Sequence, residues 1–150
     1  MLDQIDEKLL ALLKRDAKKK YSDLAQELDL SPPSVHARVK KLEQSGLIKS
    51  YNIDIDASML GLKLCAFVRL TIEGSSCTDL CKALSGFPEV EEFYIVAGDE
   101  CVLLKVRTTD TAALGSFLDT LRTITGVKKT ITSVVLSVPL DRGITPRLPV

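Results

Sequence analysis

The side chains best suited to chemistry in this sequence are the short polar and basic ones between residues 31 and 41. Small groups can meet base edges in the major groove of DNA, and lysine and arginine neutralise backbone phosphates. Here the small groups come first and positive charge follows, an order that suits a helix whose N-terminal end enters the groove. The candidate DNA-binding residues are Ser31, Pro33, Ser34, His36, Ala37, Arg38, Lys40 and Lys41.

Two short helices joined by a tight turn are predicted to position these residues. The first helix covers residues 22–28, the turn is Asp29-Leu30, and the second helix opens at Ser31-Pro32 and stops at Ser45-Gly46. Serine caps a helix start, proline at the first helical position loses no needed donor, and glycine suits the left-handed residue that ends a helix. Surface helices also carry basic residues for solvation alone, but the preceding helix and turn favour a helix-turn-helix. The predicted buried contact joins Val35, Val39 and Leu42 to Leu24, Ala25 and Leu28.

Composition limits the chain to one or two small globular domains. It has 150 residues, of which 45% are hydrophobic and 27% charged, with a net charge of zero. The positive charge is local, because residues 14–49 hold nine Lys or Arg against five Asp or Glu. Several copies acting together would strengthen binding by such a modest patch, so multimerisation is expected.

No apolar run of transmembrane length and no signal peptide is apparent, so we expect a cytoplasmic protein with no membrane partner. The cysteines, Cys65, Cys77, Cys81 and Cys101, form no CxxC pair and lie in apolar segments. They are therefore expected to be reduced structural thiols. No metal and no cofactor is predicted, since no further Cys or His pair completes a tetrahedral set.

The N-terminal part begins with a predicted helix over residues 3–15, capped by Asp3. After the helix-turn-helix, apolar and polar residues alternate over residues 47–55, which predicts a strand that would serve as a wing and exit linker. The predicted domains are a winged helix-turn-helix over 1–50, a linker strand over 51–61, an effector-binding and oligomerisation domain over 62–141, and a tail over 142–150.

The C-terminal part alternates between strand and helix patterns. Strands are predicted over residues 64–72, 90–96, 101–106 and 127–138, with helices over 77–85 and 111–123. This βαββαβ order is typical of a ferredoxin-like four-stranded antiparallel sheet with both helices on one side, so the whole chain is predicted to be α+β. The other sheet face is expected to pair with a second copy through Val68, Leu70, Val134 and Leu136.

Residues along nearly the whole chain follow one family pattern in order. In the N-terminal part they are Leu2-Asp3, Asp6, Leu9-Leu10, Asp23-Leu24-Ala25, Leu30-Ser31, Arg38 to Glu43, Gly46-Leu47-Ile48 and Tyr51; later they are Gly61, Val90 to Tyr94, Gly98-Asp99, Leu103 to Val106, Gly126-Val127 and Thr130-Ile131-Thr132. On these residues the chain resembles the Lrp/AsnC family, the feast/famine transcriptional regulators. The resemblance implies an N-terminal winged helix-turn-helix, a C-terminal ligand-sensing domain that dimerises and often assembles as octamers, and an amino acid or related metabolite as effector.

In such relatives the effector sits between dimers, at the loop after the second strand and beside the last helix and strand. The resemblance therefore implies an effector site formed by Gly98, Asp99, Glu100, Cys101, Thr130, Thr132 and Ser133. Members commonly follow Gly-Asp with an aromatic residue and a second Asp, so Glu100 and Cys101 depart from the pattern and leave the ligand open. The added charge of Glu100 would favour a basic effector. Alternatively, Gly98-Asp99 is an ordinary hairpin turn and the threonines are simply strand formers.

The predicted function is sequence-specific binding of double-stranded DNA, with assembly and binding controlled by an amino acid or related metabolite, in a homodimer that forms tetramers or octamers. An effector-independent architectural DNA binder is the first alternative. An enzyme resembling siroheme decarboxylases of the same architecture is the second. Only one histidine is present, and neighbouring Glu91 and Glu92 would point to opposite faces of a strand, so no catalytic residues and no enzyme are predicted.

Overall fold

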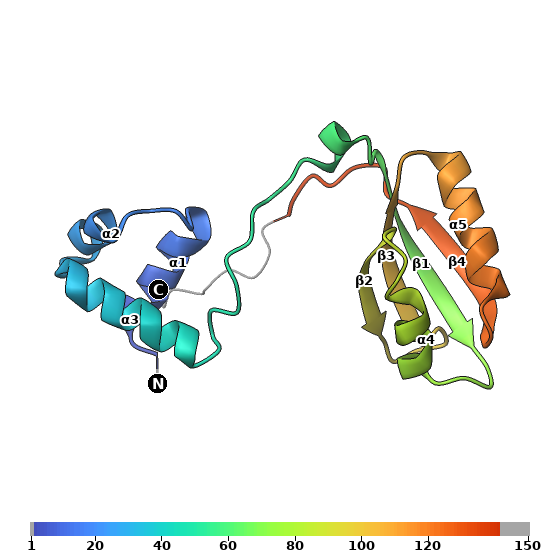
Figure 1. Cartoon of the computed structure of the whole chain (residues 1–150), viewed down its shortest axis with the longest axis horizontal. Coiled ribbons are helices and arrows are strands. Elements are labelled where there is room, and N and C mark those ends of the chain that lie inside the picture. The colour runs from blue at the N-terminus through green and yellow to red at the C-terminus, as the bar shows by residue number, and fades with distance from the viewer. Residues whose placement is uncertain (1, 142–150) are drawn as a thin grey trace. The chain divides into compact units, whose positions relative to one another are not determined.

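The computed structural model describes residues 2–141, which divide into two compact units (Figure 1). The first contains residues 2–54 together with 140 and 141, and the second contains residues 55–139. The segment expected to be a linker, residues 51–61, is thus divided between the units. The expected tail, 142–150, lies outside the described residues.

Three helices build the first unit: α1 (Gln4–Arg15), α2 (Tyr21–Leu28) and α3 (Pro32–Gln44). The start of α1 is fixed by a reciprocal capping box, in which the side chains of Asp3 and Asp6 each accept from the other's backbone N–H. The start of α3 is fixed by Ser31, whose Oγ accepts from the N–H of Ser34 at 3.3 Å. Between α2 and α3 the chain turns through Asp29, which adopts the left-handed conformation. These boundaries confirm the predicted helix-turn-helix.

The core of this unit is made by all three helices. Its buried members are Leu9, Leu13, Leu24, Ala25, Val35, Val39 and Leu42. Val35, Val39 and Leu42 form a buried stripe along α3, and its contact with α2 is the one expected from the sequence. Burial of this stripe fixes which side of α3 turns outward.

The segment after α3 is not the strand that the alternation over 47–55 predicted. Its backbone forms turns and extended stretches, and none of these residues is paired as a strand among those described. Alternation predicts a side-chain period, but a strand also requires a partner to complete its backbone ladder. In this segment Leu47, Tyr51, Ile53 and Ile55 remain exposed.

The second unit contains a short 3-10 turn, η1 (Ala57–Leu60), and an antiparallel sheet with two helices. Its elements are β1 (Leu64–Ile72), α4 (Cys77–Leu84), β2 (Val90–Ile95), β3 (Val102–Thr108), α5 (Thr111–Thr123) and β4 (Val127–Val134). The strands lie in the order β2-β3-β1-β4, with all three pairs antiparallel. The ferredoxin-like arrangement and the α+β class are thus confirmed. The last strand is shorter than predicted, ending at Val134 and not at Val138.

Both helices cover the same face of this sheet, and the core lies beneath them. Val68 and Leu70 belong to this core, together with Leu104 from β3 and Phe117 and Leu121 from α5. The expectation that Val68 and Leu70 lie on the open face is therefore wrong. They lie on the covered face, and their neighbours in the strand lie on the open one. In a strand, a shift of one residue moves a side chain to the other face.

Candidate nucleic-acid interface and effector loop

The outward side of α3 lies opposite its buried stripe. At about 100° per residue, the positions opposite Val35, Val39 and Leu42 carry small side chains first and basic ones later. These outward residues are Pro33, Ala37, Lys40, Lys41 and Gln44, and all of them are exposed. Ser31 and Ser34 at the start of the helix are exposed as well. The structure thus brings most of the candidate DNA-binding residues together on one surface.

Arg38 lies on the flank of α3 that faces α1 and is only partly exposed. Its Nη1 donates to Oδ2 of Asp3 at 2.7 Å and to Oδ1 of Asp6 at 2.6 Å. Asp6 is only 2% exposed, so its carboxylate depends on protein partners. The guanidinium therefore ties the recognition helix to the capping box of α1.

This contact shifts the pKa values of Arg38 and Asp3 in the directions that favour their charged forms. Hydrogen bonds to Asp3 and Asp6 raise the pKa of Arg38. The pKa of Asp3 is lowered, first by the backbone N–H of Asp6 and next by the side chain of Arg38. The charge of Arg38 is thus balanced within the chain, and its contact with DNA stays a prediction.

The other flank of α3 carries His36 and Glu43. The ring of His36 meets that of Tyr21, the first residue of α2, edge to face with centroids 5.7 Å apart. Oη of Tyr51 donates to Oε1 of Glu43 at 2.8 Å. Partial burial, with this hydrogen bond to the carboxylate, raises the pKa of Tyr51 to about 12. These contacts fix α3 from the side opposite Arg38.

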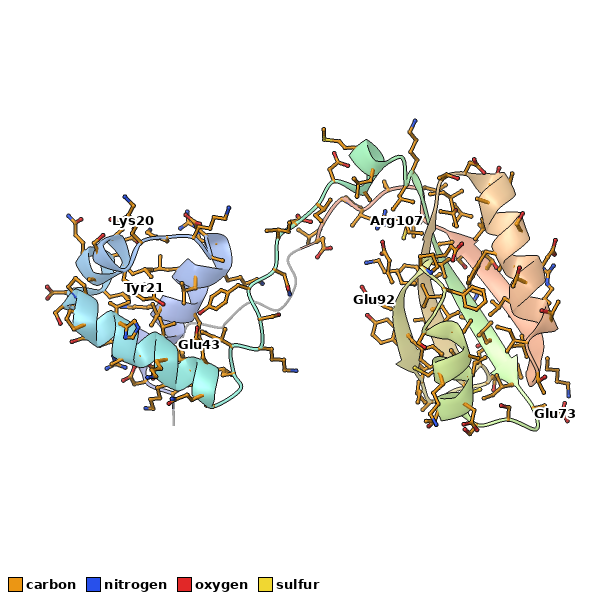
Figure 2. The ribbon with its side chains drawn as sticks, viewed as in Figure 1. Lys20, Tyr21, Glu43, Glu73, Glu92 and Arg107 are labelled. Carbon is orange, nitrogen blue, oxygen red and sulfur yellow. The ribbon has the colours of Figure 1, made fainter. Side chains whose placement is uncertain are left out.

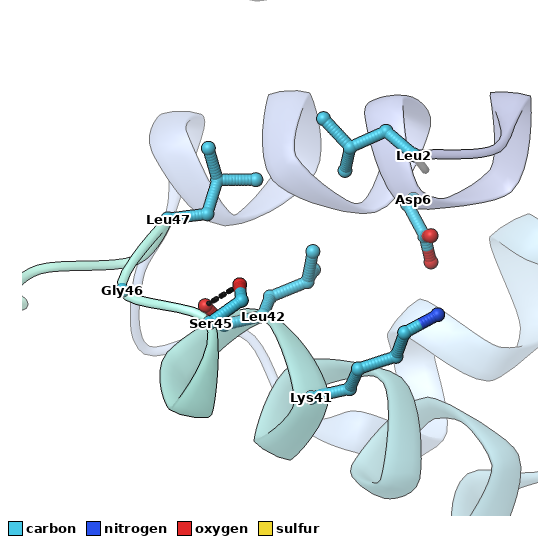
Figure 3. Close-up of a pocket in the computed structure, with 7 residues that line it drawn as sticks. All are labelled: Leu2, Asp6, Lys41, Leu42, Ser45, Gly46 and Leu47. Atoms are coloured by element: carbon cyan, nitrogen blue, oxygen red, sulfur yellow. Dashed lines mark hydrogen bonds between the residues drawn. The ribbon is translucent and has the colours of Figure 1, made fainter.

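A pocket of about 460 Å³ lies between α1 and the C-terminal end of α3 (Figure 3). Its walls are formed by the apolar side chains of Leu2, Leu42 and Leu47, with Asp6 and Lys41 at one end. Of the outward residues, only Lys41 lines it. The pocket is therefore separate from the surface that presents the small N-terminal residues of α3.

The expected effector residues fall into two groups in a single chain. Gly98, Asp99, Glu100 and Cys101 form the loop between β2 and β3, and the Sγ of Cys101 donates to the carbonyl of Leu70 at 3.8 Å. Thr130 pairs with Leu70 on β1, which itself pairs with Val102 at the start of β3. Because neighbouring strands lie about 4.8 Å apart, Thr130 is roughly 10 Å across the sheet from the end of this loop.

The β4 residues of the expected effector site also do not share one face. Thr130 and Thr132 pair with the core residues Leu70 and Val68 and therefore lie on the helix side of the sheet. Ser133 pairs with Phe67 and lies on the open face. One chain thus offers the loop and the two threonines as separate surfaces at the same end of the sheet.

The cysteines and metal-ligating side chains of residues 2–141 form neither a disulfide nor a metal-binding group. Cys65, Cys77, Cys81 and Cys101 form no disulfide. Within residues 2–141, no three His, Cys, Asp or Glu side chains gather as a metal-binding group. Over the same residues, no helix has both the length and the apolar character needed to cross a membrane.

Two features of this interface were missed by the sequence reasoning. Gln44 lies on the outward side of α3, where helical periodicity alone could have placed it. Lys18 and Lys20, treated as part of a connector, are exposed next to the start of α2 (Figure 2 labels Lys20). The signal for these lysines was their density in the sequence, since five of the seven residues from 14 to 20 are basic.

Two family models match the two units of the chain. A winged helix-turn-helix DNA-binding model matches residues 2–49, and the Lrp/AsnC ligand binding domain matches residues 65–145. The matches follow the division between the three-helix unit and the sheet unit.

Whole-length relatives agree with these matches. The regulatory protein AsnC of Haemophilus influenzae is 34% identical over 97% of this chain and 98% of its own length. The solved structure of B. subtilis LrpC has a TM-score of 0.87 at 30% identity and covers 95% of this chain and 99% of its own. The feast or famine regulatory protein Rv3291c from M. tuberculosis, solved in complex with L-methionine, has a TM-score of 0.90 at 32% identity, over 98% and 100% of the two chains.

The relatives are named as regulatory proteins, which supports the predicted non-enzymatic, DNA-binding role. The helix-turn-helix, the ferredoxin-like sheet and the whole-length similarity lead to one conclusion. The chain belongs to the Lrp/AsnC family and is a transcriptional regulator of that type.

Proposed function

We propose that this regulator binds double-stranded DNA through the outward side of α3, and that an amino acid or related small metabolite controls its assembly and its DNA binding. The observation that carries the proposal is the exposed surface of α3, with small residues at its N-terminal end and lysines behind them. In this arrangement Ser34 and Ala37 can approach base edges while Lys40 and Lys41 contact phosphates.

A homodimer would present two such helices to a pseudo-palindromic operator. Their spacing on the DNA would be about one helical turn, roughly 34 Å, if they enter successive major grooves. Each helix then raises the effective concentration of the other at the second half-site. Tetramers or octamers would extend this effect over several operator sites.

The effector would bind where the β2–β3 loop of one chain meets a neighbouring copy. Asp99 is exposed in that loop and can pair with an α-amino group, and the hydroxyls of Thr130 and Thr132 can bond the rest of a zwitterion. Support for an amino acid comes from the M. tuberculosis relative that is complexed with L-methionine. Effector binding would change DNA binding by favouring one assembly over another.

The effector part of the proposal is tested by light-scattering mass and fluorescence anisotropy on a promoter duplex, across a panel that includes L-methionine, L-leucine, L-lysine and L-arginine. We expect one amino acid to change both the mass and the DNA affinity, the latter by about 5- to 100-fold. The variant Asp99→Asn should keep DNA binding in the absence of effector and lose the response. If no amino acid changes either quantity, the regulator is an effector-independent architectural DNA binder.

The DNA-reading part predicts different effects at two neighbouring outward residues. Replacing Ala37 by glutamine should change which base is preferred at one operator position, by about 1–3 kcal/mol of discrimination, because the side chain faces the bases. Replacing Lys40 by glutamine should weaken binding to all sequences and make its salt dependence shallower by about 0.9 per lost phosphate contact. Anisotropy titrations on operator variants at several salt concentrations measure both effects. Equal losses on every sequence for both variants would contradict this assignment.

A further inference from the structure

The densest positive charge in the chain lies outside the recognition helix, from the last turn of α1 to the start of α2. Residues 14–20, here called the basic loop, contain Lys14, Arg15, Lys18, Lys19 and Lys20 against a single carboxylate, Asp16. All of these cations except Lys19 are exposed. Like charges this close repel one another, so a cluster of this kind favours an anionic partner.

The carboxylates near the basic loop engage few of its cations. The carboxylate of Asp16 accepts from the backbone N–H of Lys18 at 2.9 Å and so shapes the loop. Lys19 forms an ion pair with Glu27 of α2. Over the part of the chain that the structure describes, no ion pair involves Arg15, Lys18 or Lys20. These three charges are therefore available to bind an external anion.

The basic loop ends at Tyr21, next to the flank of α3 that carries His36. Lys20 directly precedes Tyr21, whose ring contacts that of His36 on the flank of α3 (Figure 2 labels Lys20 and Tyr21). Three residues span at most roughly 10 Å, so Lys18 also lies within that distance of Tyr21. The major groove that would receive α3 is about 12 Å wide and is bordered by phosphates on both sides. The loop is thus close enough to reach one of these phosphate rows.

We propose that Lys18 and Lys20, assisted by Arg15, bind the phosphate backbone of double-stranded DNA beside the groove that α3 enters. The inference rests on the proposed DNA-reading role of α3 and extends it by a second, sequence-independent contact. This contact would position the recognition helix and supply affinity without base preference. It also accounts for DNA binding by a chain of zero net charge, because phosphate neutralisation is concentrated on the first unit.

The test is the double variant Lys18→Gln/Lys20→Gln in the full chain, titrated by anisotropy onto a promoter duplex and a scrambled duplex over a series of salt concentrations. We expect affinity to fall by about tenfold on both duplexes. The slope of log K against log salt should become shallower by roughly 1.8 per chain, or about 0.9 for each lost contact. Hydrogen exchange of α1 and α2 should match that of the unmodified protein, since both lysines are exposed.

Two control variants separate this contact from a general charge effect. Lys18→Arg/Lys20→Arg keeps the charge and should keep the slope, whereas Lys63→Gln/Lys82→Gln removes the same charge from the second unit and should not change it. An unchanged slope in Lys18→Gln/Lys20→Gln, or an equal change in Lys63→Gln/Lys82→Gln, overturns the inference while DNA binding by α3 stands. If the unmodified protein binds neither duplex, the proposed function fails as well.

Discussion

Replacing Arg38 by alanine should destabilise the first unit by about 2 kcal/mol and abolish tight DNA binding as a consequence. The guanidinium bonds both Asp3 and Asp6, and Asp6 is almost fully buried. Breaking a buried ion pair leaves an uncompensated charge and costs about 3–5 kcal/mol. A smaller loss of about 2 kcal/mol is expected here because the Arg38 side chain is 27% exposed, so water already screens part of this ion pair.

Hydrogen-exchange mass spectrometry measures this effect separately in each unit. Peptides from α1 and α3 should exchange about 30-fold faster, while those from β1 and β3 are unchanged. Lys40→Ala is the matched control, because it removes an exposed cation from the same helix. The double variant Asp6→Leu/Arg38→Met should recover most of the stability, since an apolar pair removes the stranded carboxylate.

A different result would assign Arg38 to DNA contact. If Arg38→Ala exchanges like the unmodified protein yet loses DNA affinity with a shallower salt slope, the residue acts on phosphates. The sequence alone favoured contact between Arg38 and DNA. It places a positive charge on α3 but cannot show that Asp6, 32 residues earlier, lies against it.

The helix boundaries could be predicted because each depends on neighbouring residues. The caps by Asp3 and Ser31 act within one turn, so their effect is readable from local sequence. The periods of β1 and α5 were equally readable, and both elements have the predicted bounds. Local interactions are therefore sufficient to predict most of this fold.

The wrong predictions concern features that depend on distant residues. The alternation over 47–55 resembles a strand, but no described residue pairs with it. The phase of β1 also depends on which face the helices cover. Val68 packs beneath the helices while Phe67 remains 37% exposed on the open side. The sequence did carry a signal for this phase, since Arg69 and Thr71 share the face of Phe67 whereas the face of Val68 is apolar throughout.

The expected effector site stays a prediction, and the structure shows how its residues are arranged in one chain. The residues from Gly98 to Cys101 are contiguous, so the sequence placed them together. The family resemblance grouped Thr130 with Ser133, but the strand directs them to opposite faces of the sheet. Strand pairing decides which of these hydroxyls share a surface, and the order of residues along the chain does not show it.

The open face of the sheet leads to the second large prediction: Phe67→Arg should convert the assembled regulator to monomers. One row across this face joins Tyr94, Leu103, Arg69 and Ile131, and the next joins Glu92, Lys105, Phe67 and Ser133. Phe67 lies at the centre of its row. Beside it, Lys105 Nζ donates to Glu92 Oε1 at 3.0 Å, and the exposed Arg69 lies two residues away on the same strand.

Aromatic residues and arginine are enriched in protein–protein interfaces, and this face presents Phe67, Tyr94 and Arg69 together. In a second copy paired across this face, a new arginine at position 67 would be desolvated without a partner, which costs several kcal/mol. In a single chain the same arginine would be solvated, because Phe67 is already partly exposed. The variant should therefore fold normally and fail to assemble.

Light scattering should show Phe67→Arg at the mass of one chain, with DNA affinity for a two-half-site duplex reduced about 100-fold or more because the two recognition helices are no longer linked. Affinity for a single half-site should be nearly unchanged. Ala112→Arg, an exposed change on α5 at the opposite side of the sheet, is the matched control and should keep the assembled mass. If Phe67→Arg keeps the unmodified mass, the open face is not the assembly surface, and the linked-helix account of DNA affinity loses its structural basis.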